Sequence, residues 1–287
     1  MDYNLCDIKT VEAVLKKYGF SFSKSLGQNF LIDSEVCPKM AEFLGADEKT
    51  LVIEIGPGIG VLTKELCKTA GKVAAIELDK RLYPVLEETL GDFDNFELIE
   101  GDAMKLDLKA LISEKFSGYE KVKVCANLPY YITSPIIMKL LESELPICEI
   151  LVMVQKEAAE RLCANPGTRN SGAVSAAVKF YGDAEILFEV GRESFMPSPK
   201  VDSAVIKITL NEENKYNVSD KKAFFSFVRA AFAQRRKTLV NSVSSSLSIS
   251  KNEITNALDA LSINRSIRAE QLTMEDLVNL SDLLFNS

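Results

Sequence analysis

The sequence predicts an α/β fold with a largely parallel sheet, followed by a smaller all-helical region. Between residues 51 and 210, short apolar runs alternate with segments that have helical spacing, which is typical of βαβ units. The apolar runs are nearly continuous, as in parallel strands that are covered by helices on both faces. After the polar stretch 211–219 no strand-like run follows.

The elements follow from these patterns in chain order. Apolar residues at helical spacing predict a helix at 7–20, and the next stretch, 21–33, has the composition of a loop. We expect strands at 51–55, 72–78, 96–102, 121–126, 149–155, 184–190 and 203–210. We expect the helices among them at 61–70, 80–90, 134–143, from about 156, and at 173–181, and later helices at 221–243, 251–261 and 273–285.

Two domains are therefore expected. An α/β domain covers residues 1–210, with a helical and loop lead-in over 1–50. A linker follows at 211–219, and a helical domain covers 220–287. The lengths suit one sizeable core and a smaller one.

Composition narrows the chemistry. The 287 residues include no histidine, which excludes a Ser-His-Asp triad and a His-ligated metal. The six cysteines form no C-x-x-C pair, which opposes a zinc or redox motif, so we expect no metal. The N-terminal residues are acidic where a signal peptide is basic, and no apolar run is long enough to span a bilayer. We expect a soluble cytoplasmic protein.

Charge is unevenly distributed along the chain. The net charge is −7, but residues 221–268 carry nine basic and two acidic side chains, a local balance of +7. This asymmetry indicates an anionic partner. A basic helical surface without a partner is the alternative on charge alone.

Three successive strand ends carry residues suited to a nucleoside. Gly56, Gly58 and Gly60 follow the first strand in a G-x-G-x-G pattern, which differs from the dinucleotide fingerprint and favours a cofactor without a pyrophosphate. Glu77 can accept hydrogen bonds from ribose hydroxyls, and Asp102 can accept one from an adenine amino group. Taken singly, the glycines are also explained by a tight turn between strand and helix, and an acid by an exposed position at a strand end.

The turn "NLPYY" follows the fourth strand and faces the same edge. The Asn127 side-chain oxygen and the Leu128 backbone carbonyl can hold the two N–H bonds of an exocyclic amine and aim its nitrogen at an activated methyl group. Pro129 stiffens the turn, and Tyr130 can stack on a base that is single-stranded or flipped out. This chemistry requires positioning and no histidine.

The motifs "SLGQNFLID", "EIGPGIGVLTKEL", "IELD", "GDAMK" and "NLPYYITSP" occur in this order. Together they resemble the ribosomal RNA adenine N6-dimethyltransferase family. "SFMPSPKVDSAVIKI" and "FVRAAFAQRRKTLVNSV" are similar to its KsgA/RsmA branch, the small-subunit rRNA dimethyladenosine transferases. The resemblance runs from about residue 24 to the end.

The resemblance implies a Rossmann-like class I methyltransferase domain with a small helical C-terminal domain that binds RNA. It implies S-adenosyl-L-methionine as cofactor and two adjacent adenosines near the 3′ end of 16S rRNA, in an assembling 30S particle, as substrate. A monomer is also implied. The positions matched to cofactor contacts are Asn29, Leu31, Gly56, Gly58, Glu77, Asp102 and Asn127.

Phe195 matches a residue that stacks on the target base opposite Tyr130, with a core aromatic as the alternative. The basic residues Arg229, Arg235, Arg236 and Lys237 are expected to contact RNA phosphates, with a solvated face as the alternative.

Three other functions stay open at this point. Macrolide-resistance methylases share the glycine loop and modify large-subunit rRNA, but they usually read Asn-Ile-Pro-Tyr at the turn. A NAD-dependent oxidoreductase is opposed by the glycine spacing. A non-catalytic 30S assembly factor is opposed by the intact set of site residues.

Overall fold

The computed structural model describes residues 3–23, 27–143, 145–213 and 215–285. Residues 24–26 of the expected loop and residue 214 of the expected linker lie outside this set. The chain forms two compact units, Met1–Ala159 with Glu185–Leu210, and Glu160–Ala184 with Asn211–Ser287. Residues 160–184, which the sequence analysis placed in the α/β domain, thus pack with the C-terminal helices. Among the described residues, no helix is both long and apolar enough to cross a membrane.

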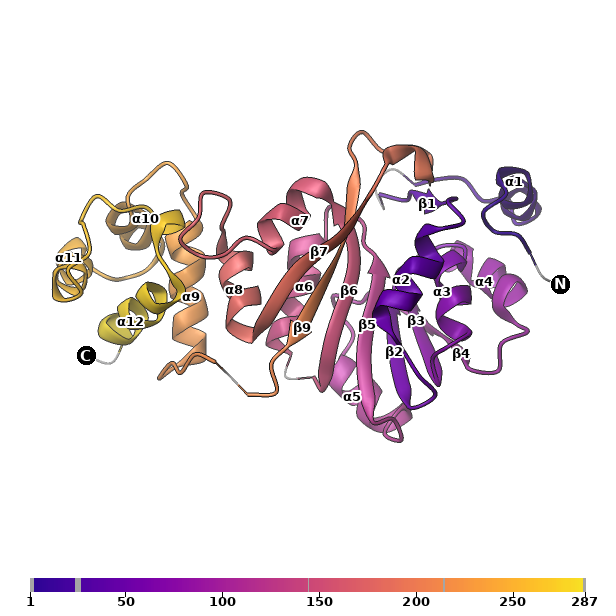
Figure 1. The fold of residues 1–287 in the computed structure, drawn as a ribbon, viewed down its shortest axis with the longest axis horizontal. Coiled ribbons are helices and arrows are strands. Elements are labelled where there is room, and N and C mark those ends of the chain that lie inside the picture. Colours follow the sequence, from indigo (N-terminus) through magenta and orange to yellow (C-terminus); the bar gives the residue numbers. More distant parts are fainter. Residues whose placement is uncertain (1–2, 24–26, 144, 214, 286–287) are drawn as a thin grey trace. The chain divides into compact units, whose positions relative to one another are not determined.

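A seven-stranded sheet forms the centre of the first unit (Figure 1). Its order is β4-β3-β2-β5-β6-β9-β7. The pairs from β4 to β6 are parallel, and β9 runs antiparallel to β6. The strands are β2 (Thr50–Ile55), β3 (Lys72–Glu77), β4 (Phe96–Glu100), β5 (Lys121–Asn127), β6 (Ile147–Gln155), β7 (Gly182–Val190) and β9 (Ser203–Leu210). The predicted α/β class is confirmed.

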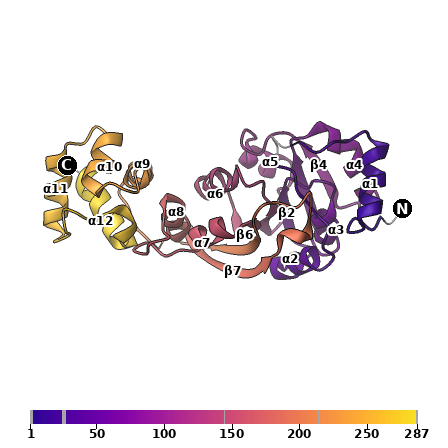
Figure 2. The same ribbon diagram turned by 90° about the horizontal axis from the view of Figure 1, so that it is seen from above.

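Helices cover both faces of this sheet (Figure 2). One face packs under α2 (Val36–Leu44), α3 (Val61–Cys67) and α4 (Tyr83–Leu90), and α5 (Leu108–Lys115) and α6 (Thr133–Glu142) lie on the other. The inward residues on the first face are fully buried, for example Val52, Cys125 and Leu151. Burial on both faces explains why β2 and the core of β6 read as nearly continuous apolar runs.

A short antiparallel pair joins two segments that lie far apart in the sequence. In it, β1 (Phe30–Leu31) pairs with β8 (Phe195–Met196), so that Leu31 lies opposite Phe195. The Ser194 hydroxyl also donates to Asp33 Oδ2 at 2.8 Å. The sequence analysis expected only a loop over 21–33, because a two-residue strand has no periodicity to detect.

The N-terminal helix α1 (Ile8–Lys17) is fastened to α4 through one carboxylate. The Glu88 side chain accepts hydrogen bonds from the hydroxyls of Tyr3 and Tyr18 and from Lys17 Nζ, the last at 2.6 Å. These bonds lower the pKa of Glu88 to about 2, with the Lys17 bond as the largest cause. We call this group of Glu88, Tyr3, Lys17 and Tyr18 the clamp between α1 and α4. None of its residues lines the pocket described below.

The second unit is helical. It contains α8 (Ala173–Tyr181), α9 (Lys221–Phe232), α10 (Leu239–Ser246), α11 (Lys251–Ala260) and α12 (Met274–Phe285), and α7 (Lys156–Leu162) leads into it. Its core is aromatic: the Phe180 ring lies 5.1 Å from that of Phe224, and Tyr181 stacks on Phe225 at 5.5 Å. These contacts explain why α8 belongs with the C-terminal helices.

The expected helix at 221–243 is two helices. It breaks after Phe232, and residues 233–238 form a turn in which Lys237 N donates to Gln234 O at 2.9 Å. Thr238 then caps α10 by accepting from Asn241 N. Arg235, Arg236 and Lys237 therefore lie in an exposed turn rather than on a helical face. Apolar spacing continues across the break, so periodicity alone did not reveal it.

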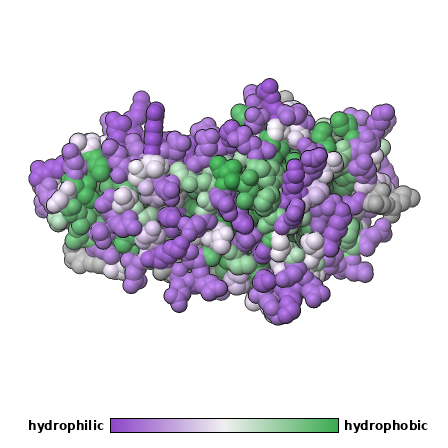
Figure 3. Space-filling model, in the orientation of Figure 1, coloured by the Kyte–Doolittle hydropathy of each residue, from purple (hydrophilic) through white to green (hydrophobic). Residues whose placement is uncertain are grey.

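The surface view shows a hydrophobic area over β7 and the neighbouring α2 (Figure 3). Ile186 of β7 is exposed, and the Phe43 ring of α2 packs against that of Phe188 in a tilted arrangement, with the centroids 5.8 Å apart. Strand β7 is the last strand of the sheet order. Glu185 and Glu189, which are exposed residues of the same strand, place charge along this edge. Natural edge strands carry such charges, which prevent pairing with other chains.

Candidate active site

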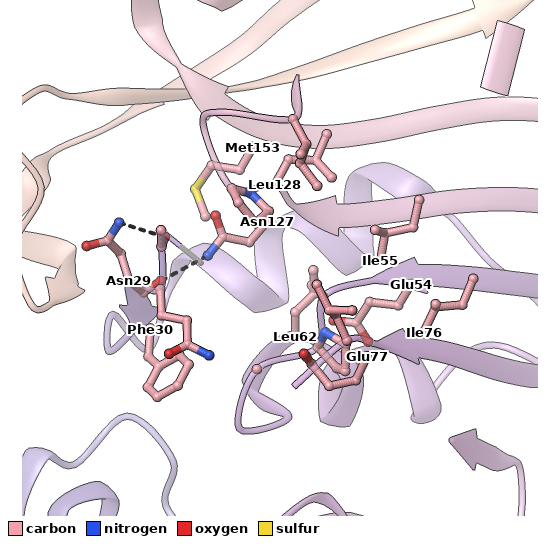
Figure 4. A pocket seen from close by; sticks show the side chains of 18 of the residues that line it. Asn29, Phe30, Glu54, Ile55, Leu62, Ile76, Glu77, Asn127, Leu128 and Met153 are labelled. Atoms are coloured by element: carbon pink, nitrogen blue, oxygen red, sulfur yellow. Dashed lines mark hydrogen bonds between the residues drawn. The ribbon is translucent and has the colours of Figure 1, made fainter. Parts of the chain in front are cut away.

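The carboxyl ends of four parallel strands form one wall of a pocket in the first unit (Figure 4). Gly56 follows β2, Glu77 ends β3, Asp102 follows β4 and Asn127 ends β5. Backbone hydrogen bonds hold the ends of neighbouring strands side by side; for example, Gly101 N donates to Glu77 O at 2.9 Å. The β1–β8 pair supplies the opposite wall. The pocket is lined by every residue predicted for the cofactor and the target base: Asn29, Leu31, Gly56, Gly58, Glu77, Asp102, Asn127, Leu128, Tyr130 and Phe195.

The glycine loop leaves room for a ligand. Gly56 has φ +73°, and an added Cβ there would meet no heavy atom within 4 Å. Gly58 has φ +60°, and a Cβ would come within 3.2 Å of the Phe30 ring. Glycine is favoured at both positions by this left-handed backbone, and at Gly58 also by the close approach of the aromatic ring. The loop thus keeps its backbone open toward the pocket.

Two carboxylates lie buried behind the loop. Glu77 is 6% exposed, and its Oε1 accepts from Asp79 N at 2.7 Å. Burial raises the pKa of Glu77 to about 7. Glu54 of β2 is 1% exposed, and burial raises its pKa to about 8. Its Oε2 has no hydrogen-bond partner among the described residues, although it lies beside the pocket.

The loop after β4 is held in place from a neighbouring helix. Lys139 of α6 donates to the backbone oxygens of Ala103 at 2.8 Å and Leu106 at 2.7 Å. Asp102 Oδ1 accepts from Met104 N at 2.9 Å, which tightens the same turn. These bonds fix the backbone that carries Asp102 at the edge of the pocket.

The side-chain amide of Asn127 spans the two walls. Its Nδ2 lies 3.4 Å from the backbone oxygen of Asn29, whose own side chain donates to Gly27 O at 3.2 Å (Figure 4). A backbone oxygen only accepts, so the NH₂ group of Asn127 must face it. The amide oxygen Oδ1 then remains as an acceptor. The turn itself is tied to β6, since Leu128 N donates to Met153 O at 3.1 Å.

Two aromatic residues complete the pocket wall. The Tyr130 hydroxyl lies 3.0 Å from Ser203 Oγ, which fixes the ring of this half-buried tyrosine. Burial raises the pKa of Tyr130, so the phenol is neutral at physiological pH. Phe195 is only 4% exposed and packs in the core cluster, as the core-aromatic alternative expects, while it also lines the pocket.

The chain matches the family model described as ribosomal RNA adenine dimethylase over residues 19–285. The chain belongs to the ribosomal RNA adenine dimethylase family. It is therefore an S-adenosyl-L-methionine-dependent rRNA adenine dimethyltransferase. The family resemblance expected from the motifs is confirmed.

Relatives of known function support this assignment across almost the full length. The chain is 49% identical over 280 residues to ribosomal RNA small subunit methyltransferase A of Bacillus licheniformis, with 96% of each chain covered. It is 46% identical over 271 residues to the protein of that name in Clostridioides difficile, covering 94% of this chain and 93% of the relative.

Two solved structures share the fold of this chain. A dimethyladenosine transferase from Plasmodium falciparum is 27% identical, with a TM-score of 0.70 over 88% of this chain and 95% of its own. The 23S rRNA methyltransferase ErmE is 24% identical, with a TM-score of 0.66, and the match covers 89% of this chain and 99% of ErmE. The Rossmann-like fold class with a helical C-terminal region is confirmed.

The lining of the dimethylase pocket suits the family cofactor. Glu54, Glu77 and Asp102 line it, and no Lys or Arg occurs among its described lining residues. S-adenosyl-L-methionine carries a sulfonium and an ammonium charge, which acidic side chains attract when they are ionised. A pyrophosphate would meet these acidic side chains and no basic one among the described lining residues. The NAD-dependent alternative is thus opposed by charge as well as by the glycine spacing.

Sequence reasoning missed three polar residues in or next to this pocket: Gln28, Asp79 and Glu54. Gln28 lines the pocket, and its Nε2 donates to Asp79 Oδ2 at 2.8 Å. Both residues stand inside quoted motifs, "GQNFL" and "IELD", but their pairing depends on a contact between segments 51 positions apart. Glu54 was also passed over, because an acid inside an apolar strand has no partner to suggest a role.

The four basic residues predicted for RNA contact lie in the helical unit and are exposed. Arg229 is on α9, and the other three are in the 233–238 turn. Arg235 donates to the backbone oxygen of Arg169 at 3.1 Å. No described carboxylate forms a salt bridge with Arg235, Arg236 or Lys237. The charges of Arg235, Arg236 and Lys237 therefore stay available to solvent.

Proposed function

We propose that this enzyme transfers methyl groups from S-adenosyl-L-methionine to N6 of two adjacent adenosines in the 3′-terminal hairpin of 16S rRNA. Each adenosine receives two methyl groups, within the 30S subunit or its precursor. The reaction takes place in the cytoplasm and accompanies small-subunit biogenesis. The 49% identity to a small-subunit enzyme over nearly the whole of both chains supports this choice of substrate.

The orientation of the Asn127 amide is the observation that carries the proposed chemistry. Its NH₂ group faces Asn29 O, so Oδ1 is left to accept one N–H bond of the adenine amino group. The backbone oxygen of Leu128 accepts the second. The lone pair of this nitrogen is delocalised into the ring, and holding both N–H bonds aims it at an electrophile.

The aromatic residues hold the base during this step. The target adenine must leave its stack to reach the pocket, and Tyr130 provides a ring whose orientation Ser203 fixes. Phe195, on the opposite wall, is proposed to contact the other face of the base with its exposed edge. Because Phe195 is largely buried, we assign most of the stacking to Tyr130.

The remaining lining residues are proposed to hold the cofactor, which supplies an activated methyl group when bound. Glu77 accepts from the ribose hydroxyls, and Asp102 accepts from the adenine amino group. Gly56 and Gly58 let the backbone approach, and Asn29 and Leu31 contact the cofactor from the β1 wall. Arg229, Arg235, Arg236 and Lys237 are proposed to contact rRNA phosphates.

The test uses radiolabelled S-adenosyl-L-methionine with 30S and 50S particles from a strain that lacks the modification, followed by mapping of the labelled nucleotides. Dimethyladenosine at two neighbouring 16S positions is the expected result. Label on 50S particles alone would place the enzyme with the large-subunit methylases. A protein that binds 30S particles and cofactor without transferring label would favour the assembly-factor function.

A further inference from the structure

Three hydrogen bonds, joined through the chain itself, link the two walls of the pocket. The set begins at Glu77, whose Oε1 accepts from Asp79 N at 2.7 Å. The Asp79 carboxylate accepts from Gln28 Nε2 at 2.8 Å. Gln28 directly precedes Asn29, whose backbone oxygen lies 3.4 Å from Asn127 Nδ2. The set thus runs from the proposed ribose-binding acid to the proposed catalytic amide.

Both ends of the Gln28–Asp79 contact are held in place. Gln28 Oε1 accepts from Ser23 N at 2.9 Å, so the amide uses both of its polar ends. Asp79 is 7% exposed and pairs with Arg81 through two bonds, Nε to Oδ1 at 2.8 Å and Nη2 to Oδ2 at 2.6 Å. A bidentate arginine pair restricts the carboxylate to one orientation.

Aromatic packing places the same segment from a second side. The Arg81 guanidinium lies 4.9 Å from the Phe20 ring centroid, and its Nη1 donates to Ser21 O at 3.1 Å. Phe20 and Phe22 in turn pack on Phe30, with centroids 5.8 and 5.2 Å away. The residues on both sides of the β1 wall therefore depend on the end of β3 for their position.

We infer that Asp79 and Gln28 are positioning residues for methyl transfer. Their hydrogen bond fixes the 27–31 segment relative to the end of β3, and thereby sets Asn29 and Asn127 against the cofactor site. The inference rests on the proposed roles of Glu77 and Asn127. Neither Asp79 nor Gln28 takes part in the chemistry. Small displacements of a positioned group have large kinetic effects, which is why a supporting contact of this kind matters.

The test compares Gln28→Ala, Gln28→Glu, Asp79→Asn and the double variant Asp79→Asn/Gln28→Glu. The dissociation constant of S-adenosyl-L-methionine is measured by calorimetry without RNA, alongside kcat, KM for the cofactor, and urea unfolding. We expect Gln28→Ala to weaken cofactor binding about tenfold, because the 27–31 segment that carries Asn29 and Leu31 loses its fixed position. We expect kcat to fall as well, because Asn127 loses its set position. Gln28→Glu should weaken cofactor binding further, since two carboxylates then face each other.

The double variant separates positioning from bulk stability. It exchanges donor and acceptor: the amide nitrogen at 79 donates to the carboxylate at 28, which still accepts from Ser23 N, while the amide oxygen at 79 still accepts from Arg81 Nε. Because Arg81 Nη2 loses its acceptor on the exchanged atom, we expect the double variant to recover part of the affinity and kcat lost in Gln28→Glu. Equal loss in the double variant and in Gln28→Glu would overturn the inference. Cofactor binding within twofold of wild type in both Gln28→Ala and Asp79→Asn would overturn it as well.

Glu88→Gln is the matched control. It weakens the clamp that holds α1 to α4, which lies outside the pocket, so it should lower stability and leave cofactor affinity unchanged. If Asp79→Asn fails to fold, the result for Gln28→Ala alone tests the inference. Gln28 is partly exposed, so its substitution should leave the fold intact. Because binding is measured without RNA, a wild-type enzyme inactive on 30S particles would reject the proposed substrate and leave this test intact.

Discussion

The amide nitrogen of Asn127 lies 3.4 Å from the backbone oxygen of Asn29, across the pocket from the strand that carries Asn127. This contact turns the amide oxygen of Asn127 away from Asn29. Under the proposed mechanism, that oxygen is the end of the amide that the substrate meets, and Asn29 of the N-terminal region takes part in placing it.

Replacing Asn127 tests the orientation of its amide. We expect Asn127→Ala to lower methyl transfer at least about a hundredfold, because one of the two acceptors for the amine is lost. Cofactor affinity should stay within about threefold of wild type. Calorimetry and single-turnover transfer measure the two effects. A fall in affinity as large as the fall in rate would reject this division of roles.

Asn127→Asp provides the sharper comparison. A carboxylate retains the acceptor for the amine but cannot donate to Asn29 O, so two acceptors would face each other. We therefore expect Asn127→Asp to be inactive at neutral pH, like Asn127→Ala. Activity close to wild type would show that the contact with Asn29 does not orient the side chain.

Cofactor affinity should depend on pH through Glu77. Burial raises the pKa of Glu77 to about 7, and the ionised carboxylate is the better acceptor for ribose hydroxyls and the better partner for a cation. Affinity should fall up to about tenfold between pH 8 and pH 6, with proton release on binding near pH 7. Calorimetry in buffers of different ionisation enthalpy measures both. Glu77→Gln should bind weakly and with a flat pH profile.

Stability should fall as pH rises, through Glu54. Its pKa is raised to about 8 from an ordinary value of 4.5, so the folded state holds a proton that the unfolded state releases between these values. Its stabilising contribution is therefore complete below about pH 4.5 and is lost as pH rises through 8. Glu54→Gln should raise the free energy of unfolding at pH 8.5 by at least about 1 kcal/mol.

Urea unfolding at pH 6 and pH 8.5 tests this expectation for Glu54→Gln against wild type. The difference between the two proteins should shrink at pH 6, where Glu54 is protonated. Surface carboxylates with lowered pKa values, such as Asp47 at about 2, titrate below this window and do not interfere. An equal effect of the substitution at both pH values would contradict the assignment.

Neutralising the exposed turn should weaken RNA binding in a salt-dependent way. Changing Arg235, Arg236 and Lys237 to Gln removes three charges, which should lower the slope of log K against log salt by about 2 to 3. Filter binding to 30S particles over a range of salt measures it. A matched control changes Lys49, Lys115 and Lys121 to Gln. These exposed residues do not line the pocket: Lys49 and Lys121 lie at the amino ends of β2 and β5, and Lys115 is the last residue of α5. Equal slopes in the two triple variants would remove the turn from the interface.

The sequence by itself determined the α/β class and most of the pocket wall that the strand ends form. Strands buried on both faces show as apolar runs, and residues such as Glu77 and Asp102 immediately follow or end them. Parallel strands finish at one edge of the sheet, so chain order alone brings these side chains together. The final strand, at 203–210, was placed at its observed bounds.

Only the tertiary structure decided which distant segments meet. The pairing of Leu31 with Phe195 and the contact of Gln28 with Asp79 join parts of the chain that carry no periodic signal. The packing of Phe180 with the C-terminal helices likewise depends on side-chain contacts. Periodicity reports which face of an element is buried, but not what covers that face. For that reason the opposite wall of the pocket, and the bonds that position Asn127, appear only once the chain is folded.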